Sequence, residues 1–169
     1  MSTIDKSDNG IEPAPRRVSP FKVLLLIAAA VLGLQYIIGP MRHSRSDSAV
    51  AWRSDFAQAA EQARAGGKVV FAEFAASWCP PCRQMERTVF ADKLFAAALE
   101  QAAVPLRVDM DQPEAQQLAT RHKVEAIPTY IVFAPDGTAL ARSGGVRSRE
   151  DLLDLVRRAS QKAATAARE

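Results

Sequence analysis

Cysteine and histidine are scarce in this chain: its 169 residues include two cysteines and two histidines. A structural zinc site takes four cysteine or histidine ligands. Such a site would need both cysteines together with His43 and His122, and we expect no metal site and no cofactor. Two cysteines are also too few for a disulfide scaffold, so the cysteine count alone does not identify the cellular compartment.

The chain also lacks a concentration of charge and any visible internal repeat. Its 22 lysines and arginines are scattered among 19 acidic residues, for a formal net charge of +3. This mild, mixed charge argues against a nucleic-acid partner. About 115 residues follow the N-terminal tail, which is enough for one compact domain.

The chain does contain a Cys-x-x-Cys motif, Trp78-Cys79-Pro80-Pro81-Cys82. The apolar run over residues 69–75 predicts a buried strand before the motif, and the residues after it predict a helix. A dithiol at a strand-to-helix junction is typical of redox exchange, in which disulfides of other proteins are made or broken. The alternatives are two buried structural cysteines or half of a zinc site.

The spacing of the motif suits this chemistry. We expect Cys79 at the N-cap of the helix and Cys82 one turn later, close enough for the sulfurs to bridge. Unpaired N–H groups and the helix dipole favour a thiolate at Cys79. Pro80 and Pro81 fit the first turn, where a missing N–H costs little. Pro80 also stiffens the loop and removes one N–H that would otherwise reach the sulfur.

A long apolar stretch lies near the N-terminus, over residues 21–39. As a helix it would be roughly 28 Å long, which matches the hydrocarbon core of a bilayer. Arg16 and Arg17 precede it, so the positive-inside rule places residues 1–20 in the cytoplasm. We therefore predict a single transmembrane helix.

A cleaved signal peptide is the alternative to an anchor. It requires a short charged region and small residues just after the apolar core. Here the preceding region is about 20 residues long, and the candidate site Ala49-Val50-Ala51 lies too far downstream. We favour an uncleaved signal anchor in the inner membrane of a Gram-negative cell, with a linker at 40–51, a periplasmic domain at 52–163 and a tail at 164–169.

Periodicity and turn signals predict the order α-β-α-β-α-β-β-α. The expected elements are a helix capped by Ser54 and ending at Ala65, strands at 68–75 and 104–110, a helix from the motif towards Glu100, a helix at 113–123, strands at 129–134 and 138–143, and a last helix capped by Ser148. This order gives an α/β domain in which helices cover a mixed sheet.

These motifs resemble the thioredoxin-fold oxidoreductases from Trp52 to about Ala163. The resemblance rests on the Cys-x-x-Cys motif, Ile127-Pro128-Thr129, Pro135-Asp136-Gly137 and Gly144-Gly145. The segments Phe74–Cys79 and Glu86–Phe90 look most like the C-terminal thioredoxin-like domain of DsbD. Membrane-tethered thioredoxin-like proteins of cytochrome c maturation are similar by the same signs. The resemblance implies a thioredoxin fold and a redox-active Cys79–Cys82 disulfide.

The resemblance also implies roles for residues around the dithiol. Pro128 would follow a cis peptide bond opposite Cys79, exposing the backbone of Ile127 to a substrate strand, although the residues alone leave cis and trans open. Glu73 matches the buried acid that helps to deprotonate the second cysteine, Cys82. A carboxylate in such a run is otherwise exposed on a sheet edge.

Glu86 lies on the same helix face as both cysteines. It either sits near the active site, as in DsbD-like domains, or is a solvated residue that pairs with Arg83. Arg107 is a possible partner of Glu73 from the neighbouring strand. Trp78 either shields the sulfurs or only packs. The residues expected to contact the substrate are Trp78, Pro80, Pro81, Ile127 and Pro128.

The sequence therefore predicts a periplasmic protein-disulfide oxidoreductase. Ile127 before Pro128 and the acid at Glu73 look more like reducing thioredoxins, so we expect a reductase of protein disulfides, supplied by a membrane electron donor of the DsbD type. The alternatives are an oxidase or isomerase, a Cu(I)-binding chaperone of thioredoxin fold, and an assembly domain with a vestigial dithiol.

Overall fold

The computed structural model describes residues 48–166 and residue 168. In chain order the elements are α2 (Phe56–Ala65), β1 (Val69–Ala75), α3 (Pro80–Met85), the π-helix η2 (Glu86–Phe90), α4 (Lys93–Ala102), β2 (Ala103–Asp109), α5 (Pro113–Arg121), β3 (Thr129–Phe133), β4 (Ala139–Gly144) and α6 (Arg149–Ala166). The predicted anchor at 21–39 lies outside this part of the chain. Within it, no helix has the length and apolar character needed to cross a bilayer.

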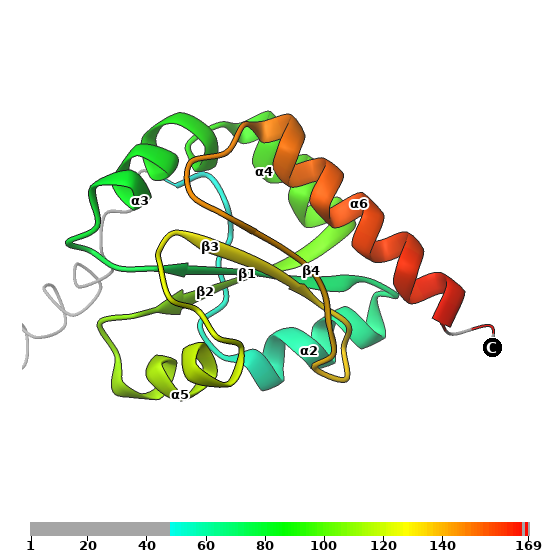
Figure 1. Ribbon diagram of the computed structural model, residues 1–169. Coiled ribbons are helices and arrows are strands. Elements are labelled where there is room, and N and C mark those ends of the chain that lie inside the picture. The colour runs from blue at the N-terminus through cyan, green and yellow to red at the C-terminus, as the bar shows by residue number, and fades with distance from the viewer. Residues whose placement is uncertain (1–47, 167, 169) are drawn as a thin grey trace, which may run out of the picture. The chain divides into compact units, whose positions relative to one another are not determined.

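The strands form one mixed sheet in the order β2-β1-β3-β4. Strands β1 and β2 are parallel, and the other two pairings are antiparallel. Helices α2 and α5 cover one face of the sheet, while α3, α4 and α6 cover the other (Figure 1). The predicted α/β domain with helices on a mixed sheet is confirmed.

Strand β1 is buried on both faces, and its side chains alternate between two hydrophobic clusters. Phe71 packs with residues of α4 and α6, whereas Val70, Ala72 and Phe74 pack with α2 and α5. Glu73 shares the face of Phe71 and is only 1% exposed. The sheet therefore carries a carboxyl group into the interior on the side of the redox helix.

Two predicted helix boundaries are wrong for local reasons. The helix after the motif does not continue to Glu100, because η2 interrupts it and Asp92 then caps a new helix by accepting from the N–H groups of Leu94 and Phe95 at 2.8 and 2.9 Å. The first helix is capped by Asp55, not Ser54. The predicted cap Ser148 is confirmed, since its Oγ accepts from Asp151 N–H at 3.1 Å.

The folded unit includes residues ahead of its predicted start at Trp52. Val50 is buried in the core, and the N–H of Ala49 donates to the carbonyl of Phe90 at 2.7 Å. Arg53 then bridges to the outer edge of β2, donating to the Pro105 carbonyl at 2.9 Å and accepting from another N–H of that strand at 2.8 Å. Residues 48–53 thus form a strap along the sheet edge, which we call the N-terminal strap.

Candidate active site

The two cysteines form a disulfide at the start of α3, with their Cα atoms 5.3 Å apart. Cys79 is the N-cap of this helix, and its Sγ accepts from the Cys82 N–H at 3.3 Å. Cys79 is 2% exposed and Cys82 is 5% exposed. The predicted N-cap position of Cys79 is confirmed.

The first turn of α3 offers the sulfur a single backbone donor. Pro80 and Pro81 occupy its first two positions and have no N–H. The Cys82 N–H is therefore the one donor of this turn that faces the Cys79 sulfur. A Cys79 thiolate gains less from hydrogen bonds here than it would in a turn with free N–H groups.

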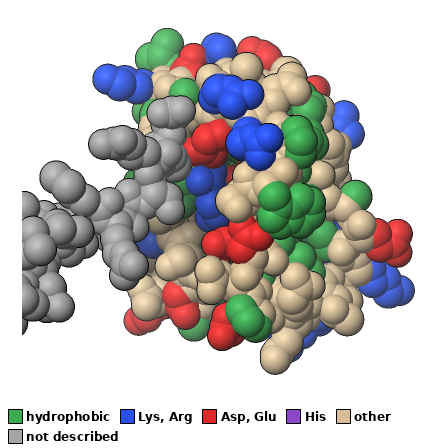
Figure 2. All heavy atoms as spheres, turned by 90° about the vertical axis from the view of Figure 1, so that its left-hand side faces the viewer, with side chains coloured by type: hydrophobic (Ala, Val, Ile, Leu, Met, Phe, Trp, Pro, Cys, Tyr) green, Lys and Arg blue, Asp and Glu red, His purple; other side chains and the backbone are tan. Residues whose placement is uncertain are grey.

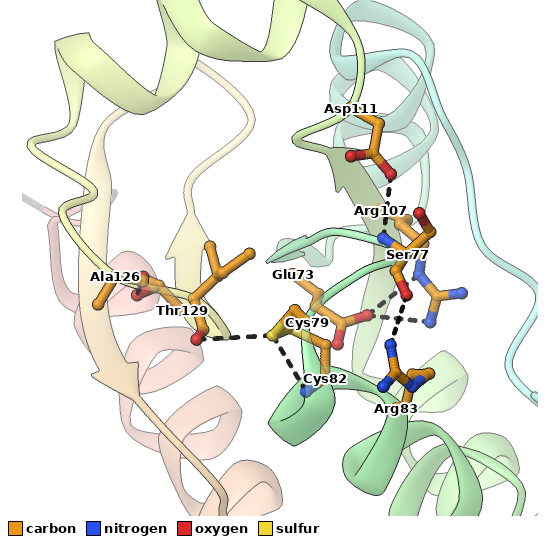
Figure 3. The surroundings of a disulfide bond; sticks show 10 residues. Glu73, Ser77, Cys79, Cys82, Arg83, Arg107, Asp111, Ala126 and Thr129 are labelled. Carbon is orange, nitrogen blue, oxygen red and sulfur yellow. Dashed lines mark hydrogen bonds and ion pairs between the residues drawn. A yellow bond between two sulfur atoms is a disulfide. The ribbon is translucent and has the colours of Figure 1, made fainter.

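The opposite wall of the site is the loop before β3. The Ile127–Pro128 peptide bond is cis, as predicted, and the Ile127 carbonyl oxygen lies 3.8 Å from the Cys79 Sγ. Thr129 is buried and donates through Oγ1 to the Ala126 carbonyl at 2.7 Å. Figure 3 shows Ala126 and Thr129 on one side of the disulfide, with the charged residues on the other.

A Thr129→Val substitution is expected to lower the free energy of unfolding by about 1 kcal/mol, because it leaves the Ala126 carbonyl without its donor at nearly constant side-chain volume. Urea unfolding at pH 7 measures this change. The matched control is Thr88→Val, since Thr88 makes the same kind of bond to the Gln84 carbonyl at an exposed position of η2. Equal losses in the two variants would contradict a special role for the buried bond.

Three charged side chains form a cluster beside the disulfide. Arg107 in β2 is the register partner of Glu73 in β1, and its Nη2 lies 2.9 Å from Glu73 Oε2 and 2.5 Å from Glu86 Oε2. The predicted approach of Arg107 to Glu73 is confirmed. The alternative pairing of Glu86 with Arg83 is not found, because Arg83 donates to the Ser77 carbonyl at 2.9 Å.

Burial raises the pKa of the Glu73 carboxyl to about 7, an effect that the Arg107 guanidinium partly offsets and the Glu86 carboxylate reinforces. Burial alone would lower the pKa of Arg107, but the two carboxylates outweigh it and raise that pKa. Glu73 therefore gains and loses a proton near neutral pH, as a general acid or base at this site requires.

The sequence did not single out Asp111, which holds the loop before the motif. Its Oδ2 accepts from the Ser77 N–H at 3.0 Å, and this bond is the foremost cause of a lowered pKa at Asp111. The parallel strands β1 and β2 end at the same edge of the sheet. Ser77 and Asp111, each two residues beyond the end of its strand, therefore lie side by side. Two neighbouring parallel strands are enough to predict this contact.

Trp52 is a second residue that the sequence did not mark. Its indole ring lies over the Arg107 guanidinium, with the ring centroid 4.4 Å from Cζ. No pattern around it distinguishes this tryptophan from an ordinary core residue. The sequence does not predict the position of Trp52, because the N-terminal strap joins the sheet edge through one isolated bridge and not through a regular strand.

The surface around the dithiol is mixed in character. Trp78 is 65% exposed and Val146 is 46% exposed, so both present apolar surface to solvent. Figure 2 views the end of the molecule that bears the start of α3, where hydrophobic side chains lie exposed between acidic and basic ones. Substrate contact through Trp78, Pro80, Pro81, Ile127 and Pro128 stays a prediction.

The chain is similar in sequence to known proteins. Residues 51–135 match the family described as thioredoxin-like. The chain is 35% identical over 106 residues to the H-type thioredoxin of Oryza sativa subsp. indica, covering 62% of this chain and 79% of that protein. It is also 35% identical over 82 residues to the thiol:disulfide interchange protein DsbD of Pseudomonas fluorescens, covering 47% of this chain and 14% of that protein.

The fold has close counterparts among solved structures. A thioredoxin from Thermus thermophilus superposes with a TM-score of 0.57 at 31% identity, covering 64% of this chain and 85% of that one. A putative disulphide-isomerase from Bacteroides thetaiotaomicron superposes with a TM-score of 0.58 at 28% identity, covering 66% of this chain and 93% of that one. Both cover most of the part of the chain that the structure describes.

Proposed function

Because the chain belongs to the thioredoxin-like family of disulfide oxidoreductases, with Cys79 and Cys82 as its redox pair, we propose that it is a membrane-anchored reductase of protein disulfides in the periplasm. The observation that best supports disulfide exchange is the position of the Cys79 sulfur, at a helix N-cap and 3.8 Å from the Ile127 carbonyl oxygen. An exposed tryptophan precedes it. In the proposed mechanism Cys79 is the nucleophile that attacks a substrate disulfide docked on this surface.

The first step is attack by the Cys79 thiolate on one sulfur of the substrate disulfide. The substrate S–S bond breaks, a mixed disulfide with Cys79 forms, and one substrate thiolate leaves. Cys82 then gives its proton to the Glu73 carboxylate and attacks the Cys79 sulfur. The mixed disulfide breaks, the second substrate thiolate leaves, and Cys79–Cys82 is oxidised as the substrate gains two electrons.

The poor stabilisation of the Cys79 thiolate supports the proposed reducing direction. A dithiol protein is a strong oxidant when its reduced form is strongly stabilised. Here the sulfur has one donor in the first turn of α3. The nearby cluster of two carboxylates and one guanidinium adds no net positive charge to stabilise a thiolate. Both features favour release of electrons to a substrate.

The location and the electron donor rest on the sequence. Residues 21–39 are apolar and long enough to span a bilayer, and arginines precede them. A reductase on the periplasmic side has no direct access to cytosolic reductants. We propose that a membrane protein of the DsbD type returns two electrons to the Cys79–Cys82 disulfide after each turnover.

The redox state of the two cysteines in growing cells tests this function. Acid quenching followed by a mass-shifting thiol reagent separates the reduced from the oxidised protein. A mostly reduced pair in the oxidising periplasm is expected, because it requires a continuous supply of electrons. A mostly oxidised pair in cells that hold the donor would overturn the reductase direction and favour an oxidase.

The same cells test the location. Proteolysis of intact spheroplasts is expected to degrade residues 48–166 and leave a membrane-bound fragment that contains the N-terminus. A soluble, protected domain would contradict the anchor. The matched control is a chain in which Leu24, Leu25 and Leu26 are replaced by lysine, which disrupts the apolar stretch.

A further inference from the structure

The Arg107 guanidinium contacts three side chains: two carboxylates and one indole. Its Nε and Nη2 donate to Glu73 Oε2 at 3.1 and 2.9 Å, and its Nη1 and Nη2 donate to the two oxygens of Glu86 at 3.5 and 2.5 Å. The indole of Trp52 covers the guanidinium at 4.4 Å. An aromatic face at this distance attracts a cation and shields it from water.

Trp52 is itself fixed in place. Its Nε1 donates to Ser48 Oγ at 2.9 Å, and its ring packs against Phe71 and, edge to face, against Phe90 at centroid distances of 6.3 and 5.1 Å. The neighbouring Arg53 is bonded to β2 through both its N–H and its carbonyl. The N-terminal strap therefore contributes a rigid side chain to the charge cluster.

Few groups face the Glu73 carboxyl, which is 1% exposed. They are Arg107 from β2, Glu86 from η2, and Tyr130 as its register partner in β3. The Tyr130 hydroxyl is buried and has no hydrogen-bond partner among the described residues. Two charged groups therefore act on Glu73 at close range: the Arg107 guanidinium lowers the pKa of its carboxyl, and the Glu86 carboxylate raises it.

We propose that Trp52 is a positioning residue that acts through Arg107 and helps to set the pH range in which Glu73 accepts a proton during the reaction. The inference rests on the proposed function, in which the proton moves from the Cys82 thiol to the Glu73 carboxylate and no electrons move in that step. Glu86 competes for the guanidinium. The indole limits the approach of water to the guanidinium. The local dielectric is therefore low, and the positive charge of Arg107 attracts the Glu73 carboxylate more strongly.

The test is the titration midpoint of Glu73, followed by carbon-13 NMR of glutamate carboxyl groups in the oxidised full-length chain. Arg107→Met is expected to raise the midpoint by roughly 1–3 pH units, because the nearest cation is lost. Glu86→Gln is expected to lower it, because a like charge is lost while an acceptor for the guanidinium remains. Trp52→Leu is expected to raise it by less than Arg107→Met, and Trp52→Phe by less again.

The control is Arg53→Met, which removes the same charge from the N-terminal strap at a side chain bonded to Gln62 on the surface. It is expected to leave the midpoint unchanged. Arg107→Lys keeps the charge and provides a second variant if Arg107→Met does not fold. Shifts of the same sign in Arg107→Met and Glu86→Gln would overturn the role of Arg107, and an unchanged midpoint in Trp52→Leu would overturn that of Trp52.

The functional consequence is read in the pH profile of substrate reduction. The profile of each active variant is expected to move along the pH axis with the Glu73 midpoint, which a general loss of structure would not produce. The NMR titration needs no substrate and no electron donor. A failure of the proposed reductase function would therefore leave the titration result standing, and the two outcomes are distinguishable.

Discussion

A Cys82→Ser variant is expected to accumulate as a mixed disulfide with its protein substrates, whereas a Cys79→Ser variant accumulates none. Cys79 lies at the helix N-cap beside the Ile127 carbonyl, and in the proposed mechanism its sulfur is the nucleophile. With serine at position 82, no second thiol is present to resolve the bond to Cys79. The complexes are measured by non-reducing electrophoresis after acid quenching, followed by mass spectrometry.

The same pair of variants gives the largest expected loss of activity. Cys79→Ser is expected to lower the rate of disulfide reduction by at least about 10³-fold, to the uncatalysed background, because the nucleophile is absent. The double variant has no thiol and controls for complexes that are not disulfide-linked. If Cys79→Ser formed complexes and Cys82→Ser did not, the order of attack proposed above would be wrong.

The free energy of unfolding of the oxidised protein is expected to decrease as the pH rises from about 4.5 to about 7, because of Glu73. The ordinary pKa of this carboxyl is 4.5, and burial raises it to about 7 in the folded protein. Between these values the folded protein holds a proton that the unfolded chain releases. Each increase in pH therefore favours unfolding, and the effect levels off above pH 7.

The size of this effect follows from the separation of the two pKa values. A separation of roughly 2.5 units at about 1.4 kcal/mol per unit gives a loss of about 3–4 kcal/mol. Glu73→Gln is expected to remove the slope, because its amide does not titrate. Chemical unfolding of both proteins at several pH values measures the difference.

Other groups act on stability in the same pH range, and the comparison with Glu73→Gln separates them. Burial lowers the pKa of His122, so the unfolded chain holds the extra proton there and stability rises with pH near 6.5. Glu61→Gln, on the exposed face of α2, is the control and is expected to keep the wild-type slope. A slope that survives in Glu73→Gln would contradict the assignment.

The parts of the site that the sequence predicts are those fixed by local chemistry. Cys79 as the N-cap and a cis bond before Pro128 follow from a motif or a family resemblance. The alternation of β1, which turns Glu73 towards the redox helix, follows from the two-residue period of a strand. These predictions hold because neighbours in the sequence decide them.

The parts that the sequence does not predict depend on contacts between distant segments. The pairing of Glu86 with Arg107 spans 21 residues and competes with a pairing to Arg83 that is closer along the chain. The break after Phe90 occurs because Asp92 starts a new helix, in a stretch whose apolar residues would also fit one continuous helix. Trp52 reaches the site through a segment with no strand pattern.

The bridge between Arg53 and β2 has a consequence for association between copies of the protein. An uncovered edge strand offers N–H and carbonyl groups on which a second chain can add a strand. Arg53 occupies the Pro105 carbonyl and the Arg107 N–H on this edge. A shortened chain beginning at Asp55 would leave both groups open to strand addition, and we expect it to aggregate more readily than the full chain.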